Sequence, residues 1–141
     1  MTLPDAVALE IARGKFPEGD VYKVALYTVA LTGITSQAYA VTNETSGTGY
    51  TAGGFTLAVG TFNPNFWGLV TTTAVYDPAD TQSGTGSTFT FQSLLVYNDT
   101  DALDVGLYFF NAGGDQIVSN GQLTIIWPTP DAVNGLVRVP Q

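Results

Sequence analysis

The sequence predicts an all-β fold: an antiparallel sandwich or barrel of about eight or nine short strands, preceded by a short N-terminal helix. Short segments rich in β-branched and aromatic residues recur at fairly regular spacing, and clusters of Gly, Asn, Asp and Pro separate them. The chain has 141 residues, the usual length of one domain. We therefore expect an N-terminal helical arm over residues 1–20 and a single β domain over residues 21–141.

A helical pattern occurs at the N-terminus, where we expect a helix over Leu3–Arg13. Thr2 is placed to cap its first turn. Leu3, Val7 and Ile11 recur every four residues and give the helix one apolar stripe. A helix of this length is only marginally stable in water. The stripe is therefore expected to pack on this domain or on a neighbouring subunit.

After residue 20 the sequence changes to strand patterns. The strands that we expect cover Val21–Leu31, Gln37–Thr42, Phe55–Val59, Phe66–Tyr76, Thr88–Asn98, Val105–Asn111, Ile117–Val118, Gln122–Trp127 and Leu136–Val139. The segment Asn43–Gly54 is dense in glycine and is expected to be a loop. The pair Gly113-Gly114 is expected to break the chain, and Asn120-Gly121 is expected to form a hairpin turn.

The charge distribution argues against two classes of partner. The chain carries 4 basic and 12 acidic residues, for a net charge of −8. Between Val24 and Val137 there are eight acids and no base. Contacts with phosphates and attachment to anionic lipids both need Lys or Arg. We therefore expect neither nucleic acid nor a membrane as a partner.

The N-terminal segment has no basic region followed by an apolar one, so it does not have the pattern of a secretory signal peptide. No apolar run reaches the length of about 18 residues that a membrane-spanning helix needs. The sequence therefore predicts a protein that is made in a cytoplasm.

The sequence offers few side chains for catalysis. It contains no Cys and no His, which removes disulfides, thiolate metal ligands and the commonest general base. The glycine-rich segments Ser46–Gly54 and Ser83–Phe89 lack the lysine and the spacing of a phosphate-binding loop. We expect no enzymatic activity, no catalytic residue and no cofactor.

One predicted turn has a pattern that suits a metal ion. Asp99, Asp101 and Asp104 place carboxylates at short spacing, and oxygen ligands suit Ca²⁺. The EF-hand pattern fails, because neither its glycine nor its closing glutamate is in place. Asp is also common in turns, where it bonds to the backbone. A solvated hairpin loop is the favoured interpretation, and a calcium site is the alternative.

Two segments are expected to contact other proteins and to gain order on assembly: the helix and the Asn43–Gly54 loop. The candidate contact residues are Leu3, Val7, Ile11, Tyr50 and Phe110. Phe109 and Phe110 are adjacent, so they cannot both point to one side of a strand. One of this pair is therefore expected outside the core, at a subunit contact.

The order of motifs resembles a group of small virion structural proteins of tailed bacteriophages. The motifs are a short helix followed by KVALYT (Lys23–Thr28), NETSGTGYTAGG (Asn43–Gly54), LLVYN (Leu94–Asn98), VGLYFF and LTIIWP (Leu123–Pro128). The similarity extends over Leu3–Val139, and SGTGYTAGG is its most specific part. The resemblance implies a β-rich virion protein with no catalytic residues to transfer.

The function expected first is that of a capsid decoration or cement protein, which binds the major capsid protein or other virion subunits. An acidic exterior fits the outside of a capsid better than its DNA-facing side. Each bound copy stabilises the assembled lattice by linkage. The repeated sites of a symmetric shell favour a homo-oligomer, with a trimer preferred. The alternatives are a tail-associated adaptor, fibre or receptor-binding domain, and a carbohydrate-binding module or glycosidase.

Overall fold

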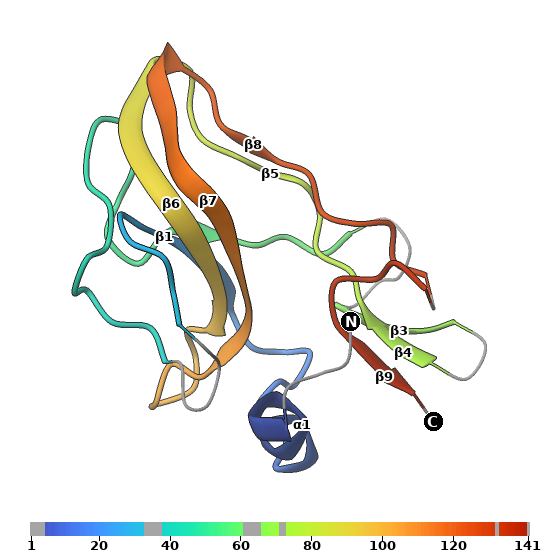
Figure 1. Cartoon of the computed structure of the whole chain (residues 1–141). Coiled ribbons are helices and arrows are strands. Elements are labelled where there is room, and N and C mark those ends of the chain that lie inside the picture. The colour runs from blue at the N-terminus through green and yellow to red at the C-terminus, as the bar shows by residue number, and fades with distance from the viewer. Residues whose placement is uncertain (1–4, 33–37, 61–65, 71–72, 132, 141) are drawn as a thin grey trace.

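The computed structural model describes residues 5–32, 38–60, 66–70, 73–131 and 133–140, with the backbone alone for residues 5–8, 70 and 140. Within these ranges one helix, α1 (Asp5–Ala12), precedes nine strands (Figure 1). The strands are β1 (Tyr22–Tyr27), β2 (Phe55–Thr56), β3 (Trp67–Val70), β4 (Thr73–Tyr76), β5 (Thr81–Gln82), β6 (Ser87–Asn98), β7 (Gly106–Gly121), β8 (Thr124–Ile125) and β9 (Arg138–Pro140). The predicted fold class, an all-β sandwich with a short N-terminal helix, is confirmed.

The largest sheet has four strands in the order β2-β1-β6-β7, and every neighbouring pair is antiparallel. β1 pairs with β6 without interruption, from Tyr22 opposite Asn98 to Tyr27 opposite Ser93. A three-stranded sheet, β3-β4-β9, and a two-stranded sheet, β5-β8, complete the sandwich.

Both faces of the large sheet are covered by side chains, because alternate residues of a strand point to opposite sides. Leu26 of β1 faces the main core, together with Tyr76 of β4 and Trp127. Its neighbour Tyr27 faces a smaller core that also contains Leu31. The chain between β1 and β2 therefore contributes to the cover of the second face.

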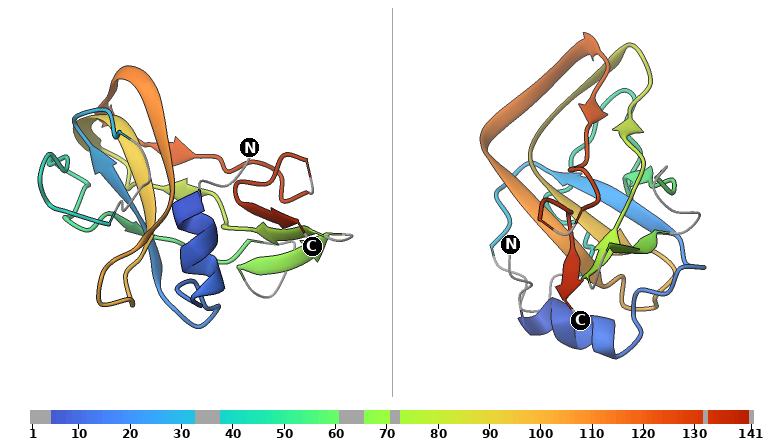
Figure 2. Two further views of the ribbon diagram at one scale, coloured as in Figure 1. Left: turned by 60° about the horizontal axis from the view of Figure 1, so that its bottom comes forward. Right: turned by 90° about the vertical axis from the view of Figure 1, so that its right-hand side faces the viewer.

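β6 and β7 belong to a long two-stranded ribbon that bends back on itself. β5 leads into β6 and β7 leads into β8, and β5 pairs with β8 as β6 pairs with β7. Figure 1 shows the bend at the top of the molecule, and the right-hand view of Figure 2 shows the angle between β7 and β8. Asn120 has the positive φ of a turn residue, 46°. The Asn120-Gly121 pair does not close a hairpin between β7 and β8, because β8 pairs with β5. It lies where the two-stranded ribbon bends. The predicted hairpin at this position is wrong.

The sequence predicts a break at Gly113-Gly114, and this prediction is wrong, because the strand does not end there. β7 continues through it, but its register against β6 shifts there. Three residues of β6, Phe91–Ser93, span the same stretch as six residues of β7, Asn111–Gln116. Three extra residues therefore bulge out of β7, and Gly113 takes up the bend with φ +83°.

The predicted strand Phe66–Tyr76 is two strands. β3 and β4 form an antiparallel hairpin in which Trp67 lies opposite Tyr76 and Leu69 lies opposite Ala74. Thr71 and Thr72 lie outside the described residues. A run of threonines carries strand propensity and no turn signal, so no local pattern divides the segment.

Other predicted strands are shorter than expected. The strand predicted to end at Leu31 ends at Tyr27, and the strand predicted over Phe55–Val59 ends at Thr56. In the predicted strand Gln37–Thr42, Gln37 lies outside the described residues and Ala38 forms an isolated bridge with Val105. The backbone of this segment is bound differently, since the N–H of Ala40 donates to the hydroxyl of Tyr27 at 3.3 Å.

Candidate protein-contact surface

Asn98, the last residue of β6, is fully buried and fixes the segment that follows α1. Its amide nitrogen donates to the backbone oxygen of Lys15 and to the carboxylate of Asp20, both at 2.7 Å. Its amide oxygen accepts from the backbone N–H groups of Thr100 and Asp101. One side chain therefore joins the N-terminal segment to β6 and to the turn before β7.

The three aspartates considered as calcium ligands have other roles. Lys15 Nζ pairs with Asp101 at 2.8 Å, and Lys23 Nζ pairs with Asp99 at 2.9 Å. The hydrogen bond from Lys15 holds the pKa of Asp101 below its usual range. Burial, followed by the negative charge of Asp99, raises the pKa of Asp104. Among the residues that the structure describes, no three Asp, Glu, His or Cys side chains gather to hold a metal ion. The calcium alternative is not supported.

The loop Asn43–Gly54 packs against the large sheet. Gly49 and Gly54 have φ values of +83° and +85°, a left-handed conformation that favours glycine. A Cβ on Gly54 would collide with the backbone oxygen of Val24, and a Cβ on Gly49 would collide with the side chain of Ser87. The loop is therefore bound to its own domain, which corrects the expectation that it is ordered only by assembly.

Tyr50, a candidate contact residue, lies in the main core. Its hydroxyl donates to Glu44 at 2.7 Å and accepts from the N–H of Leu26 at 2.9 Å. The same carboxylate of Glu44 accepts from the hydroxyl of Tyr39 at 2.8 Å and from the N–H of Gly53 at 2.7 Å. Burial, together with the bond to Glu44, raises the pKa of Tyr39 to about 12. Tyr50 thus holds the loop to β1, and its ring is not exposed for a partner.

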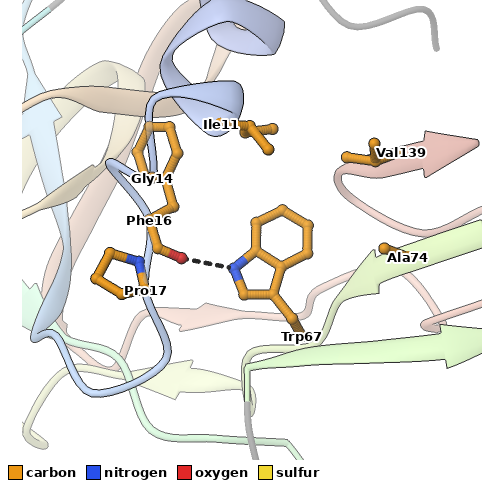
Figure 3. A pocket seen from close by; sticks show the side chains of 7 residues that line it. All are labelled: Ile11, Gly14, Phe16, Pro17, Trp67, Ala74 and Val139. Atoms are coloured by element: carbon orange, nitrogen blue, oxygen red, sulfur yellow. Dashed lines mark hydrogen bonds between the residues drawn. The ribbon is translucent and has the colours of Figure 1, made fainter.

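The apolar stripe of the helix is described only at its C-terminal end. Leu3 lies outside the described residues, and so does the side chain of Val7. Ile11 packs against the main core and lines an apolar groove of about 290 Å³ between α1 and the β3-β4-β9 sheet. Figure 3 shows the indole of Trp67 in this groove, where its Nε1 donates to the backbone oxygen of Phe16 at 3.1 Å. Ile11 therefore contacts its own domain.

Phe110 is exposed, whereas its neighbour packs inside. Phe110 has 51% of its surface exposed, and Phe109 packs against both cores. The prediction that one residue of this pair lies outside the core is confirmed. The contact that Phe110 was expected to make stays a prediction.

The folded ribbon is nearly free of charge on a molecule of net charge −8. No Asp, Glu, Lys or Arg occurs in Thr81–Asn98, and Asp115 is the only such residue in Val105–Pro130. The carboxylate of Asp115 accepts from the side chain of Gln92 at 2.8 Å. Charged residues are depleted at the centres of protein interfaces. We call these two segments the charge-poor ribbon.

β7 is an edge strand of the large sheet, and loop residues contact its first half. Ala38 forms a bridge with Val105, next to the start of β7. The side chain of Asn111 exchanges two hydrogen bonds with the backbone of Leu31, at 2.8 and 2.7 Å. In the part of the chain that the structure describes, no strand or bridge pairs with the outer side of Gln116–Gly121. We call Gln116–Gly121 the free edge.

A groove of about 350 Å³ lies beside the free edge, lined by residues from the part of the chain where β7 leads into β8. It is lined by Phe91 and by residues between Gln116 and Thr124. Two large apolar side chains are exposed on this part of the ribbon, Ile117 at 73% and Ile126 at 76%. The sequence analysis did not predict this surface, because it predicts two short strands, Ile117–Val118 and Gln122–Trp127, joined in a hairpin. The absence of charge from Gln116 to Pro130 is the signal that could have found it.

The described residues thus form a β-sandwich domain in which the last part of β7 carries no charge and pairs only with β6. Comparison with protein-family models, curated proteins and solved structures finds no match to the chain. Among the described residues, no helix is long and apolar enough to cross a lipid bilayer.

Proposed function

We propose that this chain is a structural protein of a tailed-phage particle, which decorates the head and stabilises it by binding neighbouring subunits. The observation that carries the proposal is the charge-poor ribbon, with its free edge and its exposed isoleucines, on an otherwise acidic molecule. The unpaired N–H and C=O groups of an exposed strand edge can pair with another chain. The resemblance of the sequence motifs to virion structural proteins supports the proposal that the chain is part of a phage particle.

The arrangement of charge suits attachment by one end of the molecule. The turn between β6 and β7 contains Asp99, Asp101 and Asp104. The free edge lies at the other end of β7, away from this turn (Figure 1). With the bend of the ribbon against a lattice, these carboxylates would face solvent. Binding only to the assembled state then stabilises that state by mass action.

Particles stripped of the protein test the proposal. Purified chain added back is expected to rebind and to raise the temperature at which the particles release DNA. The Ile126→Asp variant should rebind at least tenfold more weakly, because it places a charge in an apolar contact. Leu69→Asp makes the same change at an exposed residue of β3, 64% exposed, and should rebind like the wild type. Failure of the wild-type chain to rebind contradicts the proposal.

A further inference from the structure

We propose that the groove beside the free edge binds an uncharged saccharide. The groove has a volume of about 350 Å³, and small-molecule sites in proteins measure about 300–1,000 Å³. Its lining combines apolar side chains with side-chain amides and hydroxyls, and none of its described lining residues carries a charge. This binding goes beyond attachment to a particle, because it is a property of the isolated chain.

The lack of charge around the groove selects against charged ligands. Anionic ligands are bound most strongly by Lys or Arg, and neither occurs between Val24 and Val137. The nearest carboxylate in the sequence, that of Asp115, does not line the groove and accepts from Gln92 at 2.8 Å. A cation therefore finds no opposite charge among the lining residues that the structure describes. The ligand that fits is polar and uncharged.

Two glutamine amides of the lining are held by the backbone of the ribbon. The Nε2 of Gln122 donates to the backbone oxygen of Ser83 at 2.8 Å, and the Nε2 of Gln116 donates to that of Gly114 at 3.2 Å. Each bond uses one of the two hydrogens of its amide, so each amide keeps a second donor and an acceptor for a ligand. Because these side chains are already ordered, a ligand that binds them loses less conformational entropy.

Hydroxyl groups and an aromatic ring complete the lining. The hydroxyls of Ser119 and Thr124 form no hydrogen bond with any other residue that the structure describes. A hydroxyl donates and accepts, as each hydroxyl of a sugar does. Phe91 lies opposite Gln116 in the β6-β7 pair and adds apolar surface for the C–H groups of a sugar ring. Apolar surface with a few placed polar groups is typical of small-ligand sites.

A peptide strand fits this place less well than a saccharide. Pairing with a peptide needs a regular row of backbone N–H and C=O groups. The register of β7 against β6 shifts between Val118 and Gly121, and Asn120 has a φ of 46°. This irregularity interrupts the row beside the groove. A saccharide needs no such row, because side chains bind its hydroxyls one by one.

Titration of the purified full chain with neutral sugars tests the proposal. The probes are the methyl glycosides of glucose, galactose, mannose, rhamnose and N-acetylglucosamine, and nuclear magnetic resonance of isotope-labelled protein follows the backbone amides. At least one probe should shift the amides of Gln116–Thr124 with a dissociation constant of about 1 mM or below. If none shifts them at about 10 mM, ten times that constant, the proposal is overturned.

Variants of the lining hydroxyls show whether the sugar occupies the groove. Ser119→Ala and Thr124→Val should each raise the dissociation constant about threefold or more, as the loss of a neutral hydrogen bond does. Thr56→Val removes an exposed hydroxyl of β2 and should leave the constant unchanged. Circular dichroism checks that the variants fold. Binding that neither groove variant weakens overturns the proposal.

A peptide probe separates the saccharide from a strand-like ligand. A blocked peptide of alternating threonine and valine is uncharged and extended, and it should not shift the amides of Gln116–Thr124. If this peptide binds and no sugar does, the groove is a peptide site and the proposal is overturned.

The saccharide site and the proposed function fail in distinguishable ways. Ile126 does not line the groove, so Ile126→Asp should weaken rebinding to particles and leave sugar binding unchanged. A wild-type chain that binds a sugar but does not rebind stripped particles overturns the proposed function and supports the saccharide site. A chain that rebinds particles but binds none of the sugars does the reverse.

Discussion

Gly54 and Gly113 share a backbone conformation and differ in their surroundings. Their φ values are +85° and +83°. A Cβ on Gly54 would collide with the backbone of Val24, whereas a Cβ on Gly113 would meet nothing within 4 Å. The same substitution at the two positions therefore separates the cost of a left-handed conformation from the cost of a collision with β1.

We predict that Gly113→Ala lowers the free energy of unfolding by about 1–2 kcal/mol, the cost of a side chain in the left-handed region. Gly54→Ala should lower it by about 4 kcal/mol or more, because the loop must also move away from β1. Urea unfolding followed by circular dichroism measures both values. Equal losses would show that the loop is not pressed against β1.

The sequence predicted this loop from its glycine content, but it did not predict which strand the loop contacts. The collision between Gly54 and Val24 joins residues 30 positions apart, and no local pattern encodes it. For the same reason Tyr50 was expected on the surface. Its burial depends on Glu44 and on the N–H of Leu26, which come together only after the strands pair.

At the scale of elements, α1 is attached through the chain that follows it. Asn98 binds the backbone of Lys15, and Lys15 pairs with Asp101. These contacts join the N-terminal segment to the end of β6 across more than 80 residues of sequence. By contrast, Arg13 pairs with Glu10 on the helix itself, and the side chain of Arg13 is 57% exposed.

We expect Asn98→Ala to lower the free energy of unfolding by about 2–3 kcal/mol. Its removal leaves the part-buried groups of Lys15, Asp20 and Asp101 without this partner, and an unsatisfied group costs about 1–3 kcal/mol when it is buried. Arg13→Ala is the control and should change the value by less than about 1 kcal/mol, as for other exposed ion pairs. Thermal and urea unfolding provide the comparison. A loss for Asn98→Ala no larger than the control would mean that this junction does not hold the N-terminal segment.

The element that the sequence predicted best is β6, expected over Thr88–Asn98 and observed over Ser87–Asn98. The first half of β6 alternates between buried and more exposed residues and its second half is buried. Both features are local patterns of the sequence, so they could be predicted. The pairing of β5 with β8 was not predicted, because each has only two residues and their partnership depends on the bend of the ribbon. The two charge-poor segments can be read from the sequence, but only the pairing of β5 with β8 shows that they continue as one ribbon.

On the scale of the whole molecule, the tyrosines link stability to pH. All seven have a raised pKa, and burial is the largest cause in each case. In an unfolded chain a tyrosine ionises near pH 10. Between pH 10 and the higher native pKa values the unfolded state binds fewer protons, so the free energy of unfolding falls as pH rises. The stabilisation is complete below pH 10.

We therefore predict cooperative unfolding as the pH rises above about 10. The ultraviolet absorbance of tyrosinate and the loss of the circular dichroism signal should change together. Tyrosines that ionise near pH 10 while the circular dichroism signal persists would show that the rings are not held in the cores.

We propose that the chain works as a part of a phage particle, and its copy number in purified virions, measured by quantitative mass spectrometry, tests this proposal. We predict a constant ratio to the major capsid protein in every preparation. Absence of the chain from purified virions would show that it is not a structural part of the particle, and a few copies per virion would rule out decoration of the head.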